Sequence, residues 1–332
     1  MQRHAHSRLW FALAVVALLA VSVMPAHAQP IQPREAGNDD RVTILLLGGD
    51  AGPERSGLRT DSMIVVTVDR NTGQSAIFGV PRNLAMTPLP PDLAHPFECA
   101  CWPSLLNELY AYAEANPGRF PADDHPGALA LKGAIGHLLG LPIDYFALVD
   151  LPGFVDVVDA LGGIDLDVLA PVTIFLSPAR EGEAWQQYDI PAGRQHLDGH
   201  QALAYARSRE GGSDYDRMAR QRCLLGALAR EADVSTLLRA YPDLLDELTD
   251  SILTDVPRDE LPELIALLDK VDFAEIVVLG FVPPDYTAGW VPPGYPIPDP
   301  AWIQQTVASV LNGAGDQGEA FATLPNACEW TE

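Results

Sequence analysis

The chain has little positive charge. Its 332 residues include 21 lysines and arginines against 45 aspartates and glutamates, for a net charge of −24. A nucleic-acid binder, or a protein that binds membranes through a polybasic patch, needs a basic surface, so the sequence argues against both classes. Hydrophobic residues make up 48% and charged residues 20%, which is typical of a soluble globular protein with one large domain or two modest ones.

Several motifs of common enzyme and metal sites are missing. The chain has no G-x-S-x-G elbow, no Walker A loop, no G-x-G-x-x-G after a predicted strand and no C-x-x-C pair. His196 and His200 have the spacing of a helical metal pair, but Asp198 and Gly199 lie between them. That interruption favours a turn or a helix start over a metal site.

The N-terminus has the pattern of a secretory signal peptide. Arg3 and Arg8 precede an apolar run from Leu9 to Met24, and the sequence 26–28 is an A-x-A cleavage signal before Gln29. The run has 16 residues, fewer than the roughly 20 needed to span a bilayer, and an uncleaved anchor is the alternative. Either way, we expect an extracytoplasmic body, secreted or anchored at the outer face of the cytoplasmic membrane or in the cell wall.

Only four cysteines are present, at positions 99, 101, 223 and 328. An even number in an exported chain predicts disulfides, and four cysteines allow three pairings. Because a ring closed between Cys99 and Cys101 would be strained, we expect each of them to pair with Cys223 or Cys328.

The hydrophobic pattern predicts an α/β chain. A continuous apolar run at 42–47 predicts a buried strand that ends at Asp50, and the turn signal at 71–73 joins strands at 61–69 and 75–80. Further strands are expected at 145–150, 164–168 and 276–282, and helices at 105–114, 128–139, 154–161, 199–206, 214–231, 235–251 and 258–270.

The expected organisation is a signal peptide or anchor at 1–28, a linker at 29–41, an α/β domain at 42–282 and a proline-rich tail at 283–332. Within the domain, we expect a core at 42–231 and a helical and strand extension at 232–282. The segment 283–300 contains seven prolines and several aromatic residues, among them Trp290. This composition predicts an extended tail.

Arginine is concentrated in one segment of this acidic chain. Nineteen of the 21 basic residues are arginines, and five of them lie between Arg207 and Arg222. Arginine is the better bidentate partner for carboxylate and phosphate, so this segment predicts either internal salt bridges or an anion site. The anion site is favoured because Asp50, Asp61 and Arg82 follow or open three predicted strands, and would meet at one rim.

Two carboxylates with several arginines suit a divalent metal bound to a diphosphate. Mg²⁺ binds one or two carboxylates plus substrate phosphate oxygens, and arginines neutralise charge on a transferring phosphoryl group. Asp214, Arg217, Arg220 and Gln221 have spacings of three, three and one, which place them on one broad helix face. Each residue also has an ordinary explanation, as a turn residue, an edge charge or a salt-bridge partner.

Several segments together resemble the LytR-CpsA-Psr (LCP) family of cell-wall glycopolymer phosphotransferases. They run in the family's order over about 190 residues: ILLLGGD at 44–50, RTDSM at 59–63, VPR at 80–82, LNELYA at 106–111, ALGGI at 160–164, LDGHQAL at 197–203, YARSR at 205–209, DYDR at 214–217 and RQ at 220–221.

This resemblance implies an α/β fold with a central mixed sheet flanked by helices. It also implies an extracytoplasmic enzyme that moves a glycan phosphate from a polyprenyl-diphosphate carrier to a peptidoglycan hydroxyl, releasing polyprenyl phosphate. The lipid substrate would keep it at the membrane surface, with its tail in an apolar tunnel. Apolar residues of the helices expected at 128–139 and 154–161 are candidate linings, although ordinary core is the better interpretation of each taken by itself.

The resemblance also assigns roles to residues. Asp50 and Asp61 would hold Mg²⁺, and Asp61, Arg82 and Arg217 would be catalytic. The diphosphate would be bound by Arg59, Arg82, Arg207, Arg217 and Arg220, supported by Arg209, Asp214 and Gln221.

One position departs from the family pattern. The family usually has Pro-Arg-Asp where this chain has Pro81-Arg82-Asn83, and an asparagine cannot act as a base. Asp61 or Asp214 could substitute, or the reaction could need little base catalysis. The alternatives to a transferase are a polyprenyl-diphosphate hydrolase and a non-catalytic envelope protein that binds prenyl diphosphates. We expect neither Asp61 nor Arg217 to be core, so alanine there should stop turnover without unfolding the protein.

Overall fold

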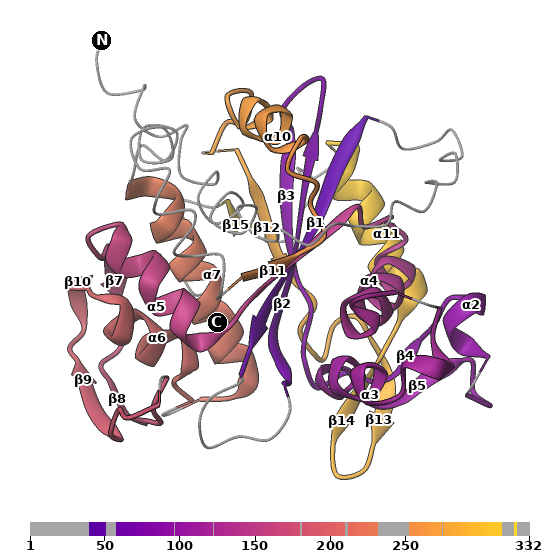
Figure 1. Cartoon of the computed structure of the whole chain (residues 1–332), viewed down its shortest axis with the longest axis horizontal. Helices are drawn as coiled ribbons and strands as arrows, with labels where there is room; N and C mark the ends of the chain where they lie inside the picture. Colours follow the sequence, from indigo (N-terminus) through magenta and orange to yellow (C-terminus); the bar gives the residue numbers. More distant parts are fainter. Residues whose placement is uncertain are drawn as a thin grey trace.

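The protein is built on a seven-stranded mixed sheet. The structure, a computed structural model, describes residues 40–50, 58–95, 97–121, 123–179, 181–209, 212–231, 252–273, 275–313 and 322–323. The strand order is β11-β6-β1-β2-β3-β12-β15. The pairs β1–β6 and β3–β12 are parallel and the others are antiparallel. The predicted fold class, a central mixed sheet flanked by helices, is confirmed (Figure 1).

The seven strands of this sheet are β1 (Arg41–Gly49), β2 (Thr60–Asp69), β3 (Ser75–Gly79), β6 (Tyr145–Val149), β11 (Ile252–Thr254), β12 (Val277–Gly280) and β15 (Ala322–Thr323). The hairpin of β2 and β3 forms around the predicted turn at 71–73. β1 is apolar on both faces because both faces are covered: Ile44 and Leu46 pack in one core, and Leu45 and Leu47 in the other.

Helices cover the two faces of the sheet. One face packs on α10 (Leu261–Leu268). The other packs on α3 (Leu109–Ala115), α4 (Pro126–Leu139) and α11 (Pro300–Leu311). A third core holds α5 (Leu151–Ala160), α6 (Gly199–Arg207) and α7 (Asp214–Glu231) together beside the sheet. The predicted helix at 235–251 lies outside the described residues.

The described residues also form four small two-stranded sheets outside the central sheet. They are β4 (Ala85–Pro88) with β5 (Cys101–Leu105), β7 (Ile164–Val168) with β10 (Gly193–Leu197), β8 (Val172–Leu176) with β9 (Gln186–Ile190), and β13 (Thr287–Val291) with β14 (Tyr295–Pro298). The remaining elements are α2 (Pro91–Ala94) and the 3₁₀ turns η1 (Leu106–Glu108) and η2 (Pro117–Arg119).

The described part of the proline-rich segment is not an extended tail. It forms the β13–β14 hairpin and then α11, which buries Ile303, Val307 and Val310 against the core. Proline is tolerated in β14 because a two-stranded ribbon leaves one edge of the strand without a partner, where no N–H is needed. Pro296 and Pro298 are also the two buried residues of β14. The high proline content of this segment does not reveal the alternating burial of β14.

The expected cysteine pairing is also wrong. Cys99 bonds to Cys101, with the Cα atoms 5.0 Å apart, inside the usual range for a disulfide. The intervening Ala100 has a positive φ of 50°, and this turn of the backbone closes the small ring that we expected to be too strained. Cys223 is disulfide-bonded as well, and Cys328 lies outside the described residues.

The predicted signal peptide or anchor lies outside the described residues. Within the described ranges, no helix combines the length and apolar character required to cross a membrane.

Candidate active site

The site begins where β1 ends and β2 starts. The backbones of Asp50 and Arg59 bond at 2.9 Å, and Asp50 Oδ1 accepts a second hydrogen bond of 2.9 Å from the Arg59 amide. Gly48 allows the two strands to approach here, because a Cβ on it would lie 2.9 Å from Ser62 Cβ. This close approach sets Asp50 and Asp61 at the same edge of the sheet.

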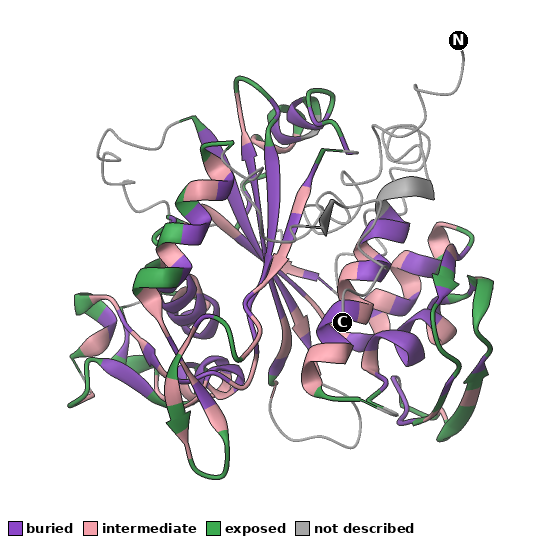
Figure 2. Cartoon of the chain, turned by 180° about the vertical axis from the view of Figure 1, so that it is seen from behind, coloured by how far each residue is buried: buried purple, intermediate pink, exposed green. Residues whose placement is uncertain are grey.

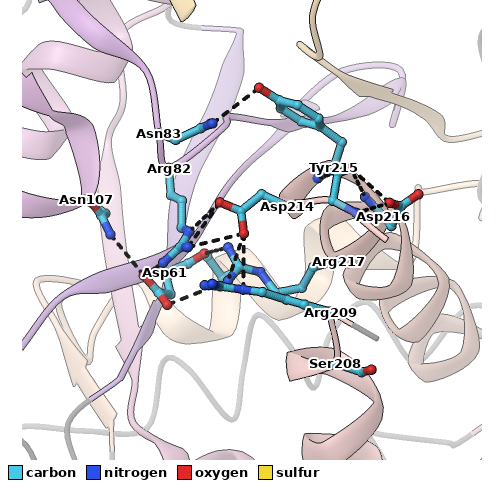
Figure 3. Close-up of polar contacts among 12 residues, drawn as sticks. Asp61, Arg82, Asn83, Asn107, Ser208, Arg209, Asp214, Tyr215, Asp216 and Arg217 are labelled. Atoms are coloured by element: carbon cyan, nitrogen blue, oxygen red, sulfur yellow. Dashed lines mark hydrogen bonds and ion pairs between the residues drawn. The ribbon is translucent and has the colours of Figure 1, made fainter. Parts of the chain in front are cut away.

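Asp61 belongs to a partly buried charge cluster that joins three parts of the chain (Figure 3). Arg82 Nη1 donates to Asp61 Oδ1 at 2.7 Å, and Arg82 Nη2 donates to Asp214 Oδ2 at 3.0 Å. Asn107 Nδ2 donates to Asp61 Oδ1 at 3.0 Å. Arg209 Nε lies 3.2 Å from Asp214 Oδ1. The sheet, the turn η1 and the start of α7 therefore converge on two carboxylates.

Arg217 lies at the centre of this cluster and is only 3% exposed. Its Nη1 is 3.7 Å from both Asp61 Oδ2 and Asp214 Oδ1, and its Nε is buried without a hydrogen-bond partner. The expectation that Arg217 lies outside the core is wrong, since its position on α7 turns it inward against β2. Its removal therefore threatens the fold as well as the site.

The pKa values show which charged forms the cluster favours. Burial alone would raise the pKa of Asp61, but the charge of Arg82 and hydrogen bonds from Arg82 and Asn107 lower it below its usual value. Burial and repulsion by Arg82 lower the pKa of Arg217 to about 10, so Arg217 stays charged at neutral pH. Arg82, Arg209 and Arg217 thus face two carboxylates, which leaves one excess positive charge in the cluster.

A cavity of about 560 Å³ opens beside the cluster, between the sheet, α5, α6 and α7. Its polar lining contains Asp50, Asp61, Ser62, Asp150, Arg207, Arg209, Arg217 and Gln221. Its apolar lining includes Leu46, Ile64, Phe154, Val157, Ile174, Leu203, Leu224, Leu225 and Leu228. The cavity is thus polar where it meets the cluster and apolar elsewhere, and its volume is in the range of small-molecule sites.

Hydrogen bonds fix three of the polar side chains at this end. Ser62 Oγ donates to Gln221 Oε1 at 3.2 Å, and Arg207 Nη1 donates to Ser177 Oγ at 3.4 Å. The helix predicted at 154–161 does contribute to the lining through Phe154 and Val157. The other candidate, 128–139, does not: α4 packs in the opposite core with α3 and α11.

Three arginines predicted to bind the diphosphate, Arg59, Arg82 and Arg220, are not in the cavity lining. Arg59 is exposed, and its Nη2 lies 3.4 Å from Glu108 Oε1. Arg220 Nη1 donates to the Ser208 carbonyl at 2.7 Å, so it supports the segment that carries Arg207 and Arg209. Arg82 and Asp214 are in the cluster but not in the lining, and they position Asp61.

Sequence reasoning missed Asp150 and Asn107 as site residues. Asp150 follows β6, which is parallel to β1 with Gly48 opposite Val149, so the two strands deliver Asp50 and Asp150 to one edge, as open α/β sheets do with ligand residues. Asp150 also caps α5 through a 2.8 Å bond from the Gly153 amide. The signal was present in the predicted strand 145–150, which ends in an aspartate as 42–50 does.

The two histidines form no metal pair. His196 lies in β10 with Nδ1 2.8 Å from Asp165, and His200 lies in α6 near Glu183. Asp198 caps α6 and forms a capping box with Gln201, which confirms the predicted helix start.

The carboxylates at the cavity suit a hard cation. Asp50 and Asp61 line the same end, and Asp61 is held in its ionised form. Across the described part of the chain, no three His, Cys, Asp or Glu side chains form a complete metal site. An ion held by Asp50 and Asp61 would therefore complete its shell with substrate oxygens and water, as Mg²⁺ commonly does.

The chain belongs to the LytR-CpsA-Psr family, whose model matches residues 22–282. The fold is similar to that of the crystal structure of TagV from B. subtilis, with a TM-score of 0.58 at 24% identity over 82% of this chain and 98% of that one. It is also similar to gbs0355 from Streptococcus agalactiae, with a TM-score of 0.62 at 21% identity over 86% and 91% of the two chains.

Two curated relatives carry the name polyisoprenyl-teichoic acid–peptidoglycan teichoic acid transferase TagU. The one from Bacillus mycoides is 24% identical over 233 residues, covering 70% of this chain and 66% of that protein. The one from Enterococcus faecalis is 26% identical over 232 residues, covering 68% and 65%. The chain therefore spans just under two thirds of the length of these relatives.

Proposed function

We propose that the protein is an extracytoplasmic, Mg²⁺-dependent phosphotransferase that moves a glycan phosphate from a polyprenyl-diphosphate carrier to peptidoglycan. The observation that carries this proposal is the cavity, in which an arginine–aspartate end continues into an apolar body. A ligand with an anionic head and a long apolar tail fits both parts. The names of the TagU relatives, which combine a polyisoprenyl-linked polymer with peptidoglycan, support the same pair of substrates.

The arginines act on the diphosphate. Arg207, Arg209 and Arg217 line the polar end, and Arg217 is a buried charge with an unpaired Nε. An anionic ligand relieves the cost of such a charge. In the transfer step, charge on the oxygens of the moving phosphoryl group is stabilised by donors that are already in position.

Asp50 and Asp61 would hold the Mg²⁺ ion. When bound, the ion neutralises diphosphate charge and fixes the orientation of the leaving group. The chain's own contribution is to keep Asp61 ionised through Arg82 and Asn107, and to hold Asp50 at the strand end through the Arg59 amide.

The acceptor step relies on positioning more than on a strong base. The hydroxyl oxygen of peptidoglycan bonds to the glycan-bearing phosphorus, the bond from that phosphorus to polyprenyl phosphate breaks, and the hydroxyl proton passes to solvent. The lowered pKa of Asp61 makes it a weak base, and both oxygens of Asp214 accept from Arg82. Neither carboxylate is therefore suited to act as a base in place of the aspartate that the family usually has at the position of Asn83.

The proposal is tested by product analysis with the full chain, Mg²⁺ and a synthetic polyprenyl-diphosphate saccharide, with and without a peptidoglycan oligomer. Mass spectrometry should detect a phosphodiester-linked adduct and polyprenyl phosphate. EDTA and the Asp61→Ala variant should abolish both. Release of glycan phosphate without an adduct would make the protein a hydrolase, and retention of intact donor without turnover would make it a binding protein.

A further inference from the structure

The β8–β9 hairpin carries two large aromatic side chains that the site does not use. Phe175 on β8 is 61% exposed and Trp185, just before β9, is 49% exposed. Their rings are nearly parallel, with an interplanar angle of 18° and centroids 6.0 Å apart. Exposed aromatics gathered on one element are typical of binding surfaces, and Figure 2 shows this hairpin at the margin of the molecule, where β9 is largely exposed and β8 is partly buried.

The same face of the hairpin carries polar side chains around Asp189, whose carboxylate accepts hydrogen bonds. Strand alternation turns Thr173, Phe175, Gln187 and Asp189 outward, and all four are exposed. Thr173 Oγ1 donates to Asp189 Oδ1 at 2.7 Å, and Gln187 Nε2 donates to both Asp189 oxygens at 3.0–3.1 Å. A carboxylate has about four acceptor positions, so Asp189 can accept further bonds from hydroxyl groups.

The hairpin is connected to the candidate active site. Ile174, the inward neighbour of Phe175, lines the cavity. Ser177, two residues beyond Phe175, accepts the hydrogen bond from Arg207. Phe175 thus lies one residue from a side chain of the cavity lining and two residues from the partner of Arg207, with its own side chain on the opposite face of β8 from Ile174.

The side chains on this face suit an uncharged, amphipathic polymer better than an anionic lipid or polymer. Residues 172–190 contain three acidic residues, Glu181, Glu183 and Asp189, against one basic residue, Arg180, so the hairpin has a net charge of −2. Acidic groups repel anionic lipid headgroups and phosphate-rich polymers. The C–H faces of pyranose rings pack on the negative faces of aromatic rings, while their hydroxyl groups donate to a carboxylate.

We propose that Phe175, Trp185 and Asp189 form a binding platform for the sugar backbone of a peptidoglycan strand, which is thereby held beside the transfer site. This inference deepens the proposed function and rests on it for the role of the strand as acceptor. The platform itself binds neutral glycan whether or not transfer occurs.

The test measures glycan binding separately from chemistry. The full chain and its Phe175→Ala, Trp185→Ala and Asp189→Asn variants are sedimented with purified sacculi stripped of attached polymers, and titrated with a β-1,4-linked N-acetylglucosamine tetramer. Trp290→Ala is the matched control, since Trp290 is 54% exposed on the separate β13–β14 hairpin. We expect each aromatic variant to bind about tenfold more weakly, a change of about 1.4 kcal/mol, and Trp290→Ala to bind like the wild type.

A second readout distinguishes the two proposals. Binding of a prenyl diphosphate, which does not involve the platform, should be equal in the wild type and the Phe175→Ala variant. If the wild type forms no adduct with donor and acceptor present but the platform variants lose sacculus binding, the proposed function fails and the binding platform stands. If all variants bind glycan like the wild type, the platform is overturned. It is equally overturned if Phe175 and Trp185 instead mediate binding to phosphatidylcholine vesicles or self-association.

Discussion

Arg82 donates to both carboxylate oxygens of Asp214, a residue 132 positions later in the chain. This pair joins the end of β3 to the first turn of α7. With Asp61 on β2 as the second partner of Arg82, the sheet and the helical part that encloses the cavity are held together at the site. The charges that would act on substrate thus also fix the two walls of its pocket.

Replacing Arg82 should therefore affect stability as well as activity. Arg82→Ala leaves Asp61 and Asp214 without their main partner in a partly buried site, and we expect a loss of about 3 kcal/mol in the free energy of unfolding. Arg194→Ala is the control, because Arg194 is 76% exposed in its pair with Asp165 and should unfold like the wild type. Urea denaturation, monitored by circular dichroism, measures the free energy of unfolding of both variants. Equal losses in the two variants would contradict the claim that the Arg82 contacts hold the sheet and α7 together.

The contribution of ionised Asp61 to the free energy of unfolding should be lost only at acidic pH. Burial would raise the pKa of Asp61, but Arg82 and Asn107 bring the folded-state pKa below the unfolded value. A group whose pKa is lower in the folded state stabilises the fold at pH values above its unfolded-state pKa. It loses that contribution as the pH falls through its folded-state pKa. The stability difference between the wild type and Asp61→Asn should therefore be constant between about pH 5 and 8, and shrink below about pH 4. A difference that shrinks near neutrality would show a raised pKa instead.

Asn83 tests the importance of base catalysis. Its Nδ2 donates to the Tyr215 hydroxyl at 3.3 Å, and its Oδ1 is buried without a partner. If transfer depends on positioning and charge, Asn83→Asp should change the rate constant of adduct formation by less than about threefold, whereas a missing general base is worth about 100-fold or more. The rate constant at several pH values is the measurement, with Asn83→Ala as the control for loss of the Tyr215 contact. A large gain that follows the titration of a new carboxylate would show that this chain lacks a base it needs.

The apolar body of the cavity should be sensitive to side-chain volume. Val157 lines it from α5 and is not fully buried, so Val157→Trp fills space with little strain elsewhere, while Val157→Ala enlarges it. We expect the tryptophan variant to bind a prenyl diphosphate at least tenfold more weakly, and the alanine variant to bind within about threefold of the wild type. Isothermal titration with a short-chain prenyl diphosphate separates the two. Equal binding by both variants would place the tail elsewhere.

The parts of the fold that were predictable are those with strong local patterns. Apolar runs predicted the central strands, and Asp198 marked the start of α6. Among the strands of the small sheets, only β7 was predicted, at 164–168; the others, each of four or five residues, gave no comparable local pattern and were missed. The segment 283–313 was mistaken for a tail because proline content hid its alternating burial.

The candidate site was predictable in composition but not in arrangement. The concentration of arginines in 207–222 predicted an anion site, yet residues on that segment behave differently: Arg217 points into the cavity while Arg220 bonds to a backbone carbonyl. Only the packing of α7 against β2 decides this. Asn107 likewise becomes a site residue because η1 lies beside Asp61, which no local pattern shows.

The most direct test of the account compares three ligands that separate the two parts of the cavity. Dissociation constants for the full chain with Mg²⁺ are measured for a prenyl diphosphate, for inorganic diphosphate and for the matching prenol, in the wild type, Arg217→Lys and Val157→Trp. We predict that the prenyl diphosphate binds at least 100-fold more tightly than either fragment, that Arg217→Lys weakens the two phosphate ligands, and that Val157→Trp weakens the two prenyl ligands. Prenyl diphosphate binding no tighter than inorganic diphosphate, and unaffected by Val157→Trp, would contradict the claim that one cavity takes both head and tail.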